Sequence, residues 1–577
     1  MTGTSRRIEG PSTDGEALLG LAVVLTLLVG AAVIAGAVHL AVLATGSHER
    51  LAANPIRLIV DLVRHRTRWP ADATAIAVGL GVFAAALAAA VIGVSRRFQR
   101  AGVHQAARWM GRGHELRPLT AGARREQAKR LGVTTPGLPI ARAVADGQLL
   151  YAGWEDVCVD VWGPRSGKTT SRAIPTIMAA PGAVLVTSNK RDVVDACRDP
   201  RSEHGRVWVF DPQLICHEPP SWCWNPLAYV TDEVKAAELA DVFALASRDP
   251  GARTDAFFDT AGQNLVAQLL LAAALAERPL TQVYLWLTDP NDDEAVRILS
   301  EHGYEILAAA LQSQVNAPEK QRGGVYGTAL EMCSFMTNRQ AMRWVVADDD
   351  RPQFVPIRFV SSTDTLYSLS KEGRGSCAPL VTALTLAVCE AAEDLAKRSP
   401  KGRLRVPIVV VLDEAANVCR WRKLPDLYSH YGSRGICLLT ILQSFAQGVE
   451  VWGKDGMTKL WSAATIRVYG GSASESEFLE HLSLLIGDFE LQGRSVTYAS
   501  GGGGADRRTV TRQVRRERIL TVADLGALPR GTVVVFASGT RPTLARAIPW
   551  MATDDAALIQ ASIDVHDPDT GRPELQS

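Results

Sequence analysis

Two long apolar stretches near the start dominate the hydrophobic pattern of this 577-residue chain. In residues 17–45 the only side chain that can ionise is that of His39, and residues 73–95 carry no charge before Arg96. A membrane-spanning helix needs about 20 consecutive apolar residues, and neither stretch alternates like an amphipathic helix. The pattern predicts a membrane anchor, residues 1–100, with two transmembrane helices at about 17–45 and 73–95, in preference to two apolar core helices.

The rest of the chain alternates short β-branched stretches with helical patterns. Strand-like stretches occur at 183–188, 207–211, 407–413, 436–443, 465–470 and 532–538. Strands separated by helical segments are typical of a mostly parallel sheet that helices cover. The pattern therefore predicts an α/β fold in two segments, 151–230 and 350–552.

Three other segments lack this alternation. Residues 231–349 are rich in Ala and Leu and have almost no strand pattern, which predicts an inserted all-α domain. Residues 101–150 form a basic connector that Pro and Gly punctuate. The acidic, loop-like tail at 553–577 is predicted to be disordered.

The net charge and the cysteines exclude more than they indicate. The chain carries 62 Lys and Arg against 61 Asp and Glu, so its net charge of +1 does not by itself point to a nucleic-acid binder. The nine cysteines form no Cys-x-x-Cys pair, so neither a zinc site nor a disulfide framework is indicated.

Residues 157–170 combine a short apolar stretch, a glycine-containing turn and the start of a helix. This arrangement is typical of a nucleotide phosphate loop, in which backbone N–H groups converge on phosphate oxygens. The residues predicted to bind the nucleotide are Gly163, Pro164, Arg165, Ser166, Gly167, Lys168, Thr169 and Thr170. Lys168 would reach the β- and γ-phosphates of ATP, and the Thr169 hydroxyl would bind Mg²⁺. Trp162 occupies the usual position of the first glycine, and the alternative is a chance Gly-Lys-Thr in an ordinary turn.

A second candidate motif is the apolar stretch 407–412, which ends in Asp413 and Glu414. A buried strand would hold both carboxylates beside the phosphate loop, with Asp413 bound to Mg²⁺ through its water shell. Glu414 would polarise the attacking water as a general base. An ordinary strand end with an acidic helix cap is the alternative, but the presence of both motifs in one chain favours an ATPase.

Two further residues are candidates for catalysis. Gln443 ends the strand-like stretch 436–443, where it would sense the γ-phosphate or orient water, although a helix cap is the alternative. Arg434 would act across a subunit boundary as an arginine finger, and an ordinary surface arginine is the alternative.

Arginines cluster after the glycine run 501–504. They are Arg507, Arg508, Arg512, Arg515, Arg516 and Arg518. A mobile arginine-rich loop would follow a phosphate backbone without reading bases. The alternative is a charged surface that is exposed to solvent and binds no partner.

Seven short motifs occur in a recognisable order. They are GPRSGKTT, TSNKRD, VFDP, WNPL, VLDEAANV, SRG and ILQSFAQ. In this order the chain resembles, over essentially its whole length, the TraG/TraD-type coupling ATPases of type IV secretion and conjugation, and most closely their actinobacterial branch. The resemblance implies a RecA-like P-loop NTPase with an all-α domain, ATP and Mg²⁺ as cofactors, and assembly as a homo-hexamer around a channel. It also implies delivery of a relaxase-bound DNA strand to the secretion components, and it supports the roles given above to Gly163, Gly167, Lys168, Thr169, Asp413 and Glu414, and less closely to Gln443.

The combined interpretation is a multi-pass protein of the inner (cytoplasmic) membrane whose ATPase domain faces the cytoplasm. Arg96, Arg97 and Arg100 place the end of the second apolar stretch inside, although the loop between the two stretches is also basic. The leading function is ATP-driven transfer of single-stranded, relaxase-linked DNA. The alternatives are a substrate-recruiting receptor for protein secretion and a double-stranded DNA translocase of the FtsK type.

Overall fold

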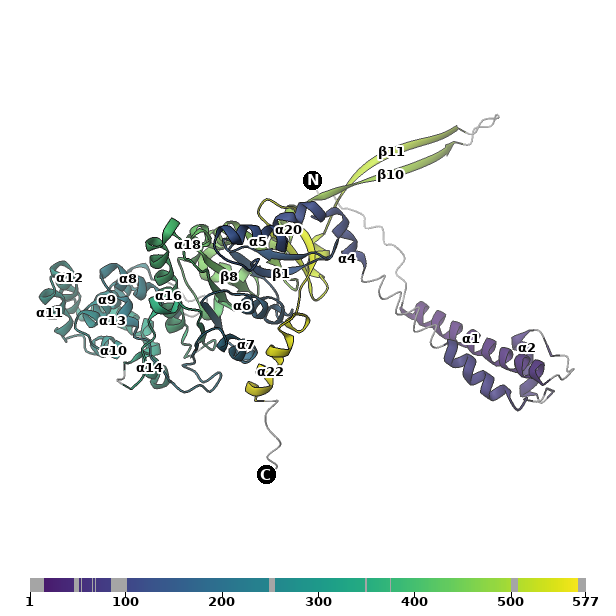
Figure 1. The fold of residues 1–577 in the computed structure, drawn as a ribbon, viewed down its shortest axis with the longest axis horizontal. Helices are drawn as coiled ribbons and strands as arrows, with labels where there is room; N and C mark the ends of the chain where they lie inside the picture. The colour runs from purple at the N-terminus through teal and green to yellow at the C-terminus, as the bar shows by residue number, and fades with distance from the viewer. Residues whose placement is uncertain are drawn as a thin grey trace, which may run out of the picture. The chain divides into compact units, whose positions relative to one another are not determined.

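The structure is a computed structural model that describes residues 15–45, 51–52, 54–64, 66–67, 69–84, 101–247, 255–347, 350–373, 375–499 and 507–568. The chain divides into two units, residues 1–102 and 103–577, and each is described by itself (Figure 1).

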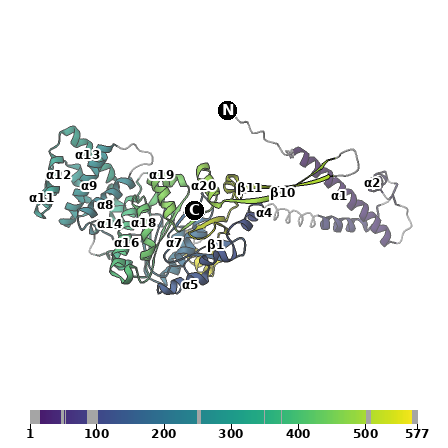
Figure 2. The same cartoon turned by 90° about the horizontal axis from the view of Figure 1, so that it is seen from above.

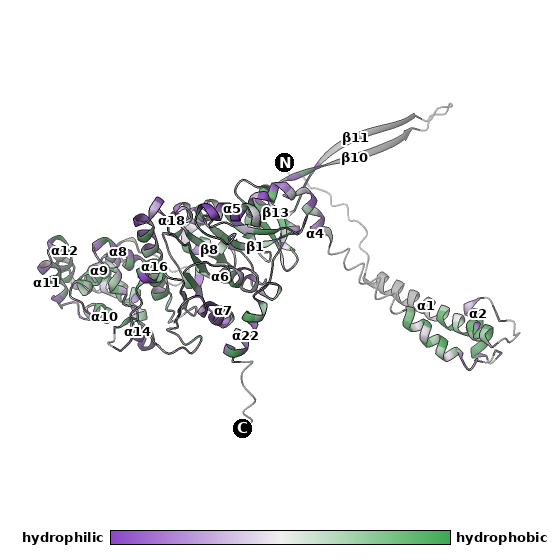
Figure 3. Ribbon diagram, viewed as in Figure 1, coloured by the Kyte–Doolittle hydropathy of each residue, from purple (hydrophilic) through white to green (hydrophobic). Residues whose placement is uncertain are grey.

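The described part of the first unit contains a long helix, a short one and a helical stretch at residues 73–84. Helix α1 (Gly15–Ala44) packs Ala35 and Val38 against Leu58 of α2 (Pro55–Val63). The part of α1 that Figure 3 colours by hydropathy is mostly hydrophobic. In the part of the chain that the structure describes, no helix combines the length and apolarity that crossing a membrane requires. The predicted transmembrane helices are therefore not confirmed, and residues 85–95 of the second lie outside the described residues.

The second unit is built on an eleven-stranded sheet. In chain order its strands are β1 (Leu138–Ala143), β2 (Leu149–Ala152), β3 (Cys158–Val161), β4 (Val184–Ser188), β5 (Val207–Phe210), β6 (Thr365–Leu369), β7 (Ile408–Leu412), β8 (Ile436–Leu442), β9 (Ile466–Tyr469), β12 (Thr532–Ala537) and β13 (Thr543–Arg546). Their order across the sheet is β2-β1-β13-β12-β9-β3-β8-β7-β4-β6-β5. The strands from β9 to β5 are parallel, whereas β12, β13, β1 and β2 add an antiparallel edge. The predicted mostly parallel α/β sheet is confirmed.

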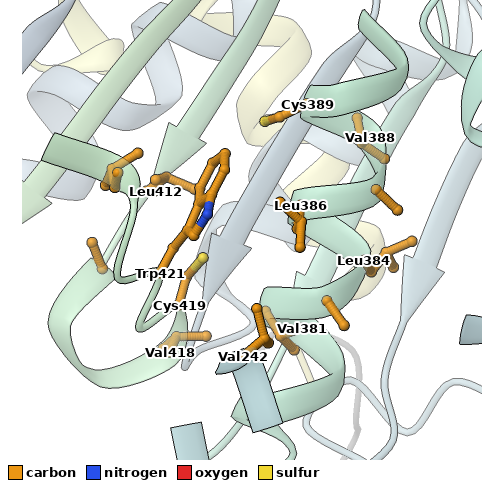
Figure 4. Packing of buried hydrophobic residues seen from close by; sticks show 14 of the residues in the cluster. Val242, Val381, Leu384, Leu386, Val388, Cys389, Leu412, Val418, Cys419 and Trp421 are labelled. Carbon is orange, nitrogen blue, oxygen red and sulfur yellow. The ribbon is translucent and has the colours of Figure 1, made fainter. Parts of the chain in front are cut away.

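Strand β7 shows why the central strands are apolar at every position. Its residues Ile408, Val410 and Leu412 belong to one hydrophobic cluster, while Val409 and Val411 belong to the cluster on the other face. A strand buried on both faces has no solvent side, so its sequence does not alternate between apolar and polar residues. Leu412 packs near Trp421 and the apolar face of α16 (Ala378–Arg398) (Figure 4).

The remaining helices of this unit cover the sheet or lie at its ends. They are α4 (Ala101–Gln105), α5 (Ala121–Arg130), α6 (Ile174–Met178), α7 (Asp192–Ser202), α15 (Pro356–Phe359), α16 (Ala378–Arg398), α17 (Ala415–Val418), α18 (Leu424–Tyr431), α19 (Phe445–Ala463), α20 (Ser476–Ile486), α21 (Val522–Gly526) and α22 (Ala556–His566).

A group of helices follows β5 and precedes β6. It comprises α8 (Glu233–Ser247), α9 (Ala256–Leu275), α10 (Leu280–Thr288), α11 (Glu294–Glu301), α12 (Glu305–Val315), α13 (Glu319–Met332) and α14 (Arg339–Val345). In both views these helices gather at one end of the unit (Figures 1 and 2). Phe243 and Leu269 share a hydrophobic cluster with Leu384 and Leu412, so the helical group and the sheet are joined by one continuous core.

The predictions for the connector and for the tail are wrong. Strands β1 and β2 extend the sheet into the segment interpreted as a connector, because they pair with β13 and with each other. In the tail that was predicted to be disordered, residues 556–566 form α22, which packs on α7. Ser562 Oγ donates to the Asp195 carbonyl at 2.6 Å, and Arg191 donates to the His566 carbonyl at 2.6 Å. Residues 569–577 lie outside the described residues.

The segment predicted as an arginine-rich loop contains two long strands. Strands β10 (Asp488–Ala499) and β11 (Arg507–Arg518) form a separate antiparallel ribbon. The loop prediction is therefore wrong for these residues.

Candidate nucleotide site

The predicted phosphate loop lies between the end of β3 and a helix. The helix starts with a π-helical turn, Thr169–Ala173, and continues as α6. Pro175 has no N–H to donate to the previous turn, which accounts for a wider turn at this point. Arg165 has φ of 57° and Gly167 has φ of 89°, so the backbone alternates in handedness along the turn. Such alternation directs successive N–H groups into one concavity that suits an anion.

The packing around Gly163 explains why this position is a glycine. The Gly163 N–H donates to the Gly471 carbonyl at 3.0 Å, in the loop that follows β9. A Cβ at position 163 would lie 2.4 Å from the Ser472 Cβ and 2.7 Å from its carbonyl oxygen. Trp162, 1% exposed, fills the core beside this contact. Glycine is thus required at 163, because the neighbouring loop leaves no room for a side chain there.

A buried ion pair anchors the helix of the phosphate loop to the sheet. Arg172 donates through Nε to Asp160 of β3 at 2.7 Å and through Nη1 to the Pro139 carbonyl of β1 at 2.8 Å. Both charged side chains are completely buried. The pair therefore holds the loop's helix against two strands at once.

Asp160→Ala is expected to lower the free energy of unfolding by about 3–5 kcal/mol, because Arg172 would keep its charge in the core without a partner. Denaturant unfolding followed by tryptophan fluorescence measures the change. A matched control is Glu126→Ala, whose partner Lys129 is 74% exposed, and it should cost less than about 1 kcal/mol. A loss below about 1 kcal/mol in Asp160→Ala would show that the pair does not stabilise the fold.

The acidic pair lies opposite the phosphate loop. Asp413 and Glu414 follow β7, and both are nearly completely buried. Lys168 Nζ contacts Glu414 Oε1 directly and lies 3.7 Å from Asp413 Oδ1. The Thr169 hydroxyl lies 3.4 Å from Asp413 Oδ2. The loop lysine and hydroxyl thus meet both carboxylates, which come from a strand some 240 residues later.

The surroundings of Asp413 fit a hard cation. Burial raises the pKa of Asp413 to about 6, against the lowering effect of Lys168. Its Oδ1 is buried without a hydrogen-bond partner. Carboxylate and hydroxyl oxygens are ligands that Mg²⁺ prefers, so Asp413 and Thr169 are suited to hold it.

Glu414 is held in a strained conformation. Its φ of 55° and ψ of 41° lie in the left-handed region, which costs a non-glycine residue about 1–2 kcal/mol. Gln443 Nε2 donates to Glu414 Oε2 at 2.6 Å, and Asn417 lies 3.4 Å from the same oxygen. Neighbouring side chains therefore fix the carboxylate of Glu414 next to Lys168.

Three polar residues behind Glu414 were given no role by the sequence interpretation. Glu372 Oε1 accepts from Asn417 at 2.8 Å and from Asn189 at 2.6 Å. Both asparagines lie inside two of the seven motifs, TSNKRD and VLDEAANV, so a signal existed for them. Glu372 follows β6, a strand that the hydrophobic pattern did not predict.

The topology explains why these residues converge. Lys168, Gln443, Glu414, Asn189 and Glu372 follow β3, β8, β7, β4 and β6, which are consecutive neighbours in the parallel sheet. Ligands of open α/β sheets bind at the carboxyl ends of the strands. The site therefore occupies the expected edge of the sheet.

The other predicted residues are placed as follows. Ser166 Oγ donates to the Gly163 carbonyl, and Thr170 Oγ1 donates to the Gly167 carbonyl at 3.0 Å, so both stabilise the turn. Arg434 precedes β8 and therefore lies at the opposite edge of the sheet. It pairs with Glu393 at 2.5 Å in the same chain. Within one chain Arg434 is not brought to the phosphate loop, and its role across a subunit boundary stays a prediction.

The cysteines lie in the interior of the protein. All nine are buried free thiols. The described residues contain no group of three or more His, Cys, Asp and Glu side chains placed to hold a metal ion.

Comparison with known proteins gives one family and one fold. Residues 407–530 match the model of the family described as the TraM recognition site of TraD and TraG. The bacterial conjugative coupling protein TrwBdeltaN70, in its unbound monoclinic form, superposes with a TM-score of 0.55 at 17% identity, over 74% of this chain and 92% of that one. The resemblance to TraG/TraD-type coupling proteins is confirmed. Its assignment to an actinobacterial branch stays a prediction.

Two further solved structures share the fold of this chain. TrwB in complex with ADP and Mg²⁺ has a TM-score of 0.52 at 16% identity and covers 69% of this chain and 85% of that one. TrwB with a non-hydrolysable ATP analogue has a TM-score of 0.51 at 17% identity and covers 69% and 86%. A comparison with curated proteins returns no match.

Proposed function

We propose that this chain is a membrane-anchored ATPase that couples ATP hydrolysis to the transfer of DNA into a type IV secretion or conjugation apparatus. The observation that carries the proposal is the meeting of Lys168 and Thr169 with Asp413 and Glu414 at the carboxyl edge of the sheet. A phosphate loop facing two buried acids is the arrangement that phosphoryl transfer requires.

ATP and Mg²⁺ are the proposed cofactors. The N–H groups of the turn 163–168 and the Lys168 ammonium would bind the phosphates, while Asp413 and Thr169 would hold the metal. TrwB, which shares the fold, has been solved with ADP and Mg²⁺, which supports this choice. When bound, Mg²⁺ neutralises charge on the phosphates.

The contacts of Glu414 suggest how hydrolysis would start. A lysine that binds phosphate oxygens can no longer pair with Glu414, so this carboxylate becomes available to accept a proton from water. Gln443 already donates to Glu414 and lies at the end of the adjacent strand, where it would orient both the carboxylate and the water. Preorganised groups of this kind lower the barrier because they need no rearrangement during the reaction.

The proposal extends to partners and location. Relaxase-linked single-stranded DNA would be the cargo, type IV secretion components the docking partners, and a homo-hexamer the working form. The chain would be a multi-pass protein of the inner membrane with the α/β unit in the cytoplasm. The match of residues 407–530 to a family described by recognition of TraM supports a docking role for this segment.

ATPase activity measured with and without single-stranded DNA tests the proposal. We expect hydrolysis to rise several-fold with single-stranded DNA. Stimulation by duplex DNA alone would favour a double-stranded translocase. No response to either DNA would favour a receptor for protein secretion and overturn the proposal.

A further inference from the structure

The β10–β11 ribbon is long, regular and paired with no other described strand. Its register runs without a break from the pair Asp488–Arg518 to the pair Ala499–Arg507. At about 3.4 Å per residue, its twelve pairs extend about 40 Å. The nucleotide site uses none of these residues.

The register sorts the ribbon's residues into two faces. Residues paired across an antiparallel ribbon share a face, and the face changes with every residue along a strand. In every pair of this register the two residue numbers are both even or both odd. Even-numbered residues therefore form one face and odd-numbered residues the other. The even face carries Arg494, Arg508, Arg512, Arg516 and Arg518, whereas the odd face carries Arg507 and Arg515.

Contacts at the base of the ribbon, where β10 begins and β11 ends, show which face is exposed to solvent. On the odd face, the Phe489 ring stacks on Trp109 with centroids 5.0 Å apart. On the even face, Arg516 and Glu490 pair at 3.2 Å while remaining 75% and 58% exposed. Apart from Arg518, which also pairs with Glu480 of α20 at 3.5 Å, the even face is therefore the solvent side at the base. The odd face is the side that packs against the segment before β1.

The even face has more positive charge than its own residues balance. Asp488 and Glu490 pair with Arg518 and Arg516 at the base. At its paired positions 492–498 and 508–514 the even face carries no acidic residue. Arg494 and Arg512 are directly opposite one another in the register. Like charges directly opposite destabilise a ribbon, so this arrangement favours an anion that lies across both strands.

The spacing of the arginines suits a polyanion. Positions 508, 512 and 516 of β11 recur every four residues, which corresponds to steps of about 14 Å. The major groove of B-DNA is about 12 Å wide and admits a two-stranded β-ribbon. Arginine binds phosphate oxygens with two donors at once and keeps its charge at any physiological pH.

We propose that the even face of the β10–β11 ribbon binds the phosphate backbone of DNA. This inference rests on the proposed function, in which DNA is the cargo, and it adds a binding surface outside the nucleotide site. Arg494 and Arg512 form its centre, and Arg508 and Arg516 extend it along β11.

The test compares two double variants of the full chain that remove the same charge. Arg494→Ala/Arg512→Ala alters the even face, and Arg507→Ala/Arg515→Ala alters the odd face. Binding of a fluorescent single strand of about 30 nucleotides and of the matching duplex is measured over a series of salt concentrations. The even variant should weaken binding about tenfold or more, and the odd variant should change it less than about twofold.

The salt dependence adds an independent readout. Loss of two phosphate contacts should reduce the slope of log K against log salt by about 1.4 for a single strand and about 1.8 for a duplex. The form of DNA that shows its expected change is the natural ligand. Equal weakening in both variants, or none in either, would overturn the proposal.

Two controls test whether the arginines contact phosphate and whether the bound polyanion is DNA. Arg494→Lys/Arg512→Lys keeps both charges and should retain most of the binding, so its failure to bind would overturn a phosphate contact. Even-face dependence of binding to vesicles of anionic lipid, without any effect on DNA, would assign the face to a membrane and overturn the proposal as well.

The ATPase assay distinguishes failure of this inference from failure of the proposed function. Basal hydrolysis should be unchanged in the even variant, because the ribbon lies outside the nucleotide site. If DNA stimulates the even variant as strongly as the parent protein, the ribbon proposal is wrong and the proposed function stands. If DNA binding needs the even face but stimulates no hydrolysis, the ribbon proposal stands and the proposed function is wrong.

Discussion

Lys168→Ala is expected to reduce ATP hydrolysis at least about 100-fold, the effect of removing one preorganised charged donor from a phosphoryl-transfer site. Lys168 contacts Glu414 and lies 3.7 Å from Asp413, so it is the only cation within 4 Å of either carboxylate in the described part of the chain. Its loss removes both a phosphate contact and the charge that balances two buried acids. A coupled assay of phosphate release measures hydrolysis.

A matched control accompanies this variant. Lys129→Ala removes the same charge from an exposed position of α5 and should leave hydrolysis unchanged. Thermal unfolding shows whether the Lys168 variant is folded. A folded Lys168→Ala protein that hydrolyses ATP at the parent rate would show that the phosphate loop has been assigned to the wrong residues.

Glu414→Gln is expected to bind ATP but to hydrolyse it at least about 100-fold more slowly, because an amide cannot accept a proton from water. The amide has nearly the same shape as the carboxylate, and it can still hydrogen-bond to Gln443 and Asn417. Nucleotide affinity should therefore be retained. Binding of a fluorescent ATP analogue and single-turnover hydrolysis measure the two effects separately.

The control for this variant changes a carboxylate to an amide at an exposed site. Glu126→Gln, where the side chain is 65% exposed, should alter neither affinity nor turnover. Parent-like turnover in Glu414→Gln would remove Glu414 from the chemical step. Loss of affinity together with turnover would instead place Glu414 among the groups that bind the nucleotide.

The central residues of the candidate site were predictable from the local sequence. The turn with Gly167, Lys168 and Thr169 requires glycine conformations and a helix start, which are properties of neighbouring residues. The strand that ends in Asp413 and Glu414 was recognisable from one continuous apolar stretch. The six predicted strands occur within a residue or two of their expected positions for the same reason.

Residues that act through distant partners were not predictable from pattern. The tail was expected to be disordered from its composition, yet α22 is held by Ser562 and His566 on α7. Glu372 acquires its neighbours only because β6 lies beside β4 in the sheet. Neither short stretch has a periodicity that reports its partners. Those of Glu372 are 45 and 183 residues away, and those of α22 are 367 and 375 residues away.

The sequence by itself determined the α/β class, the phosphate loop, the acidic strand and the glutamine that follows β8. These features depend on a few adjacent residues, whose backbone preferences and apolar periodicity act locally. Only the tertiary structure decided that Lys168 meets Glu414, that Asp160 neutralises Arg172 in the core, and that the arginines of the ribbon divide between two faces. Those outcomes depend on strand order and register, which arise from pairing between segments far apart in the chain.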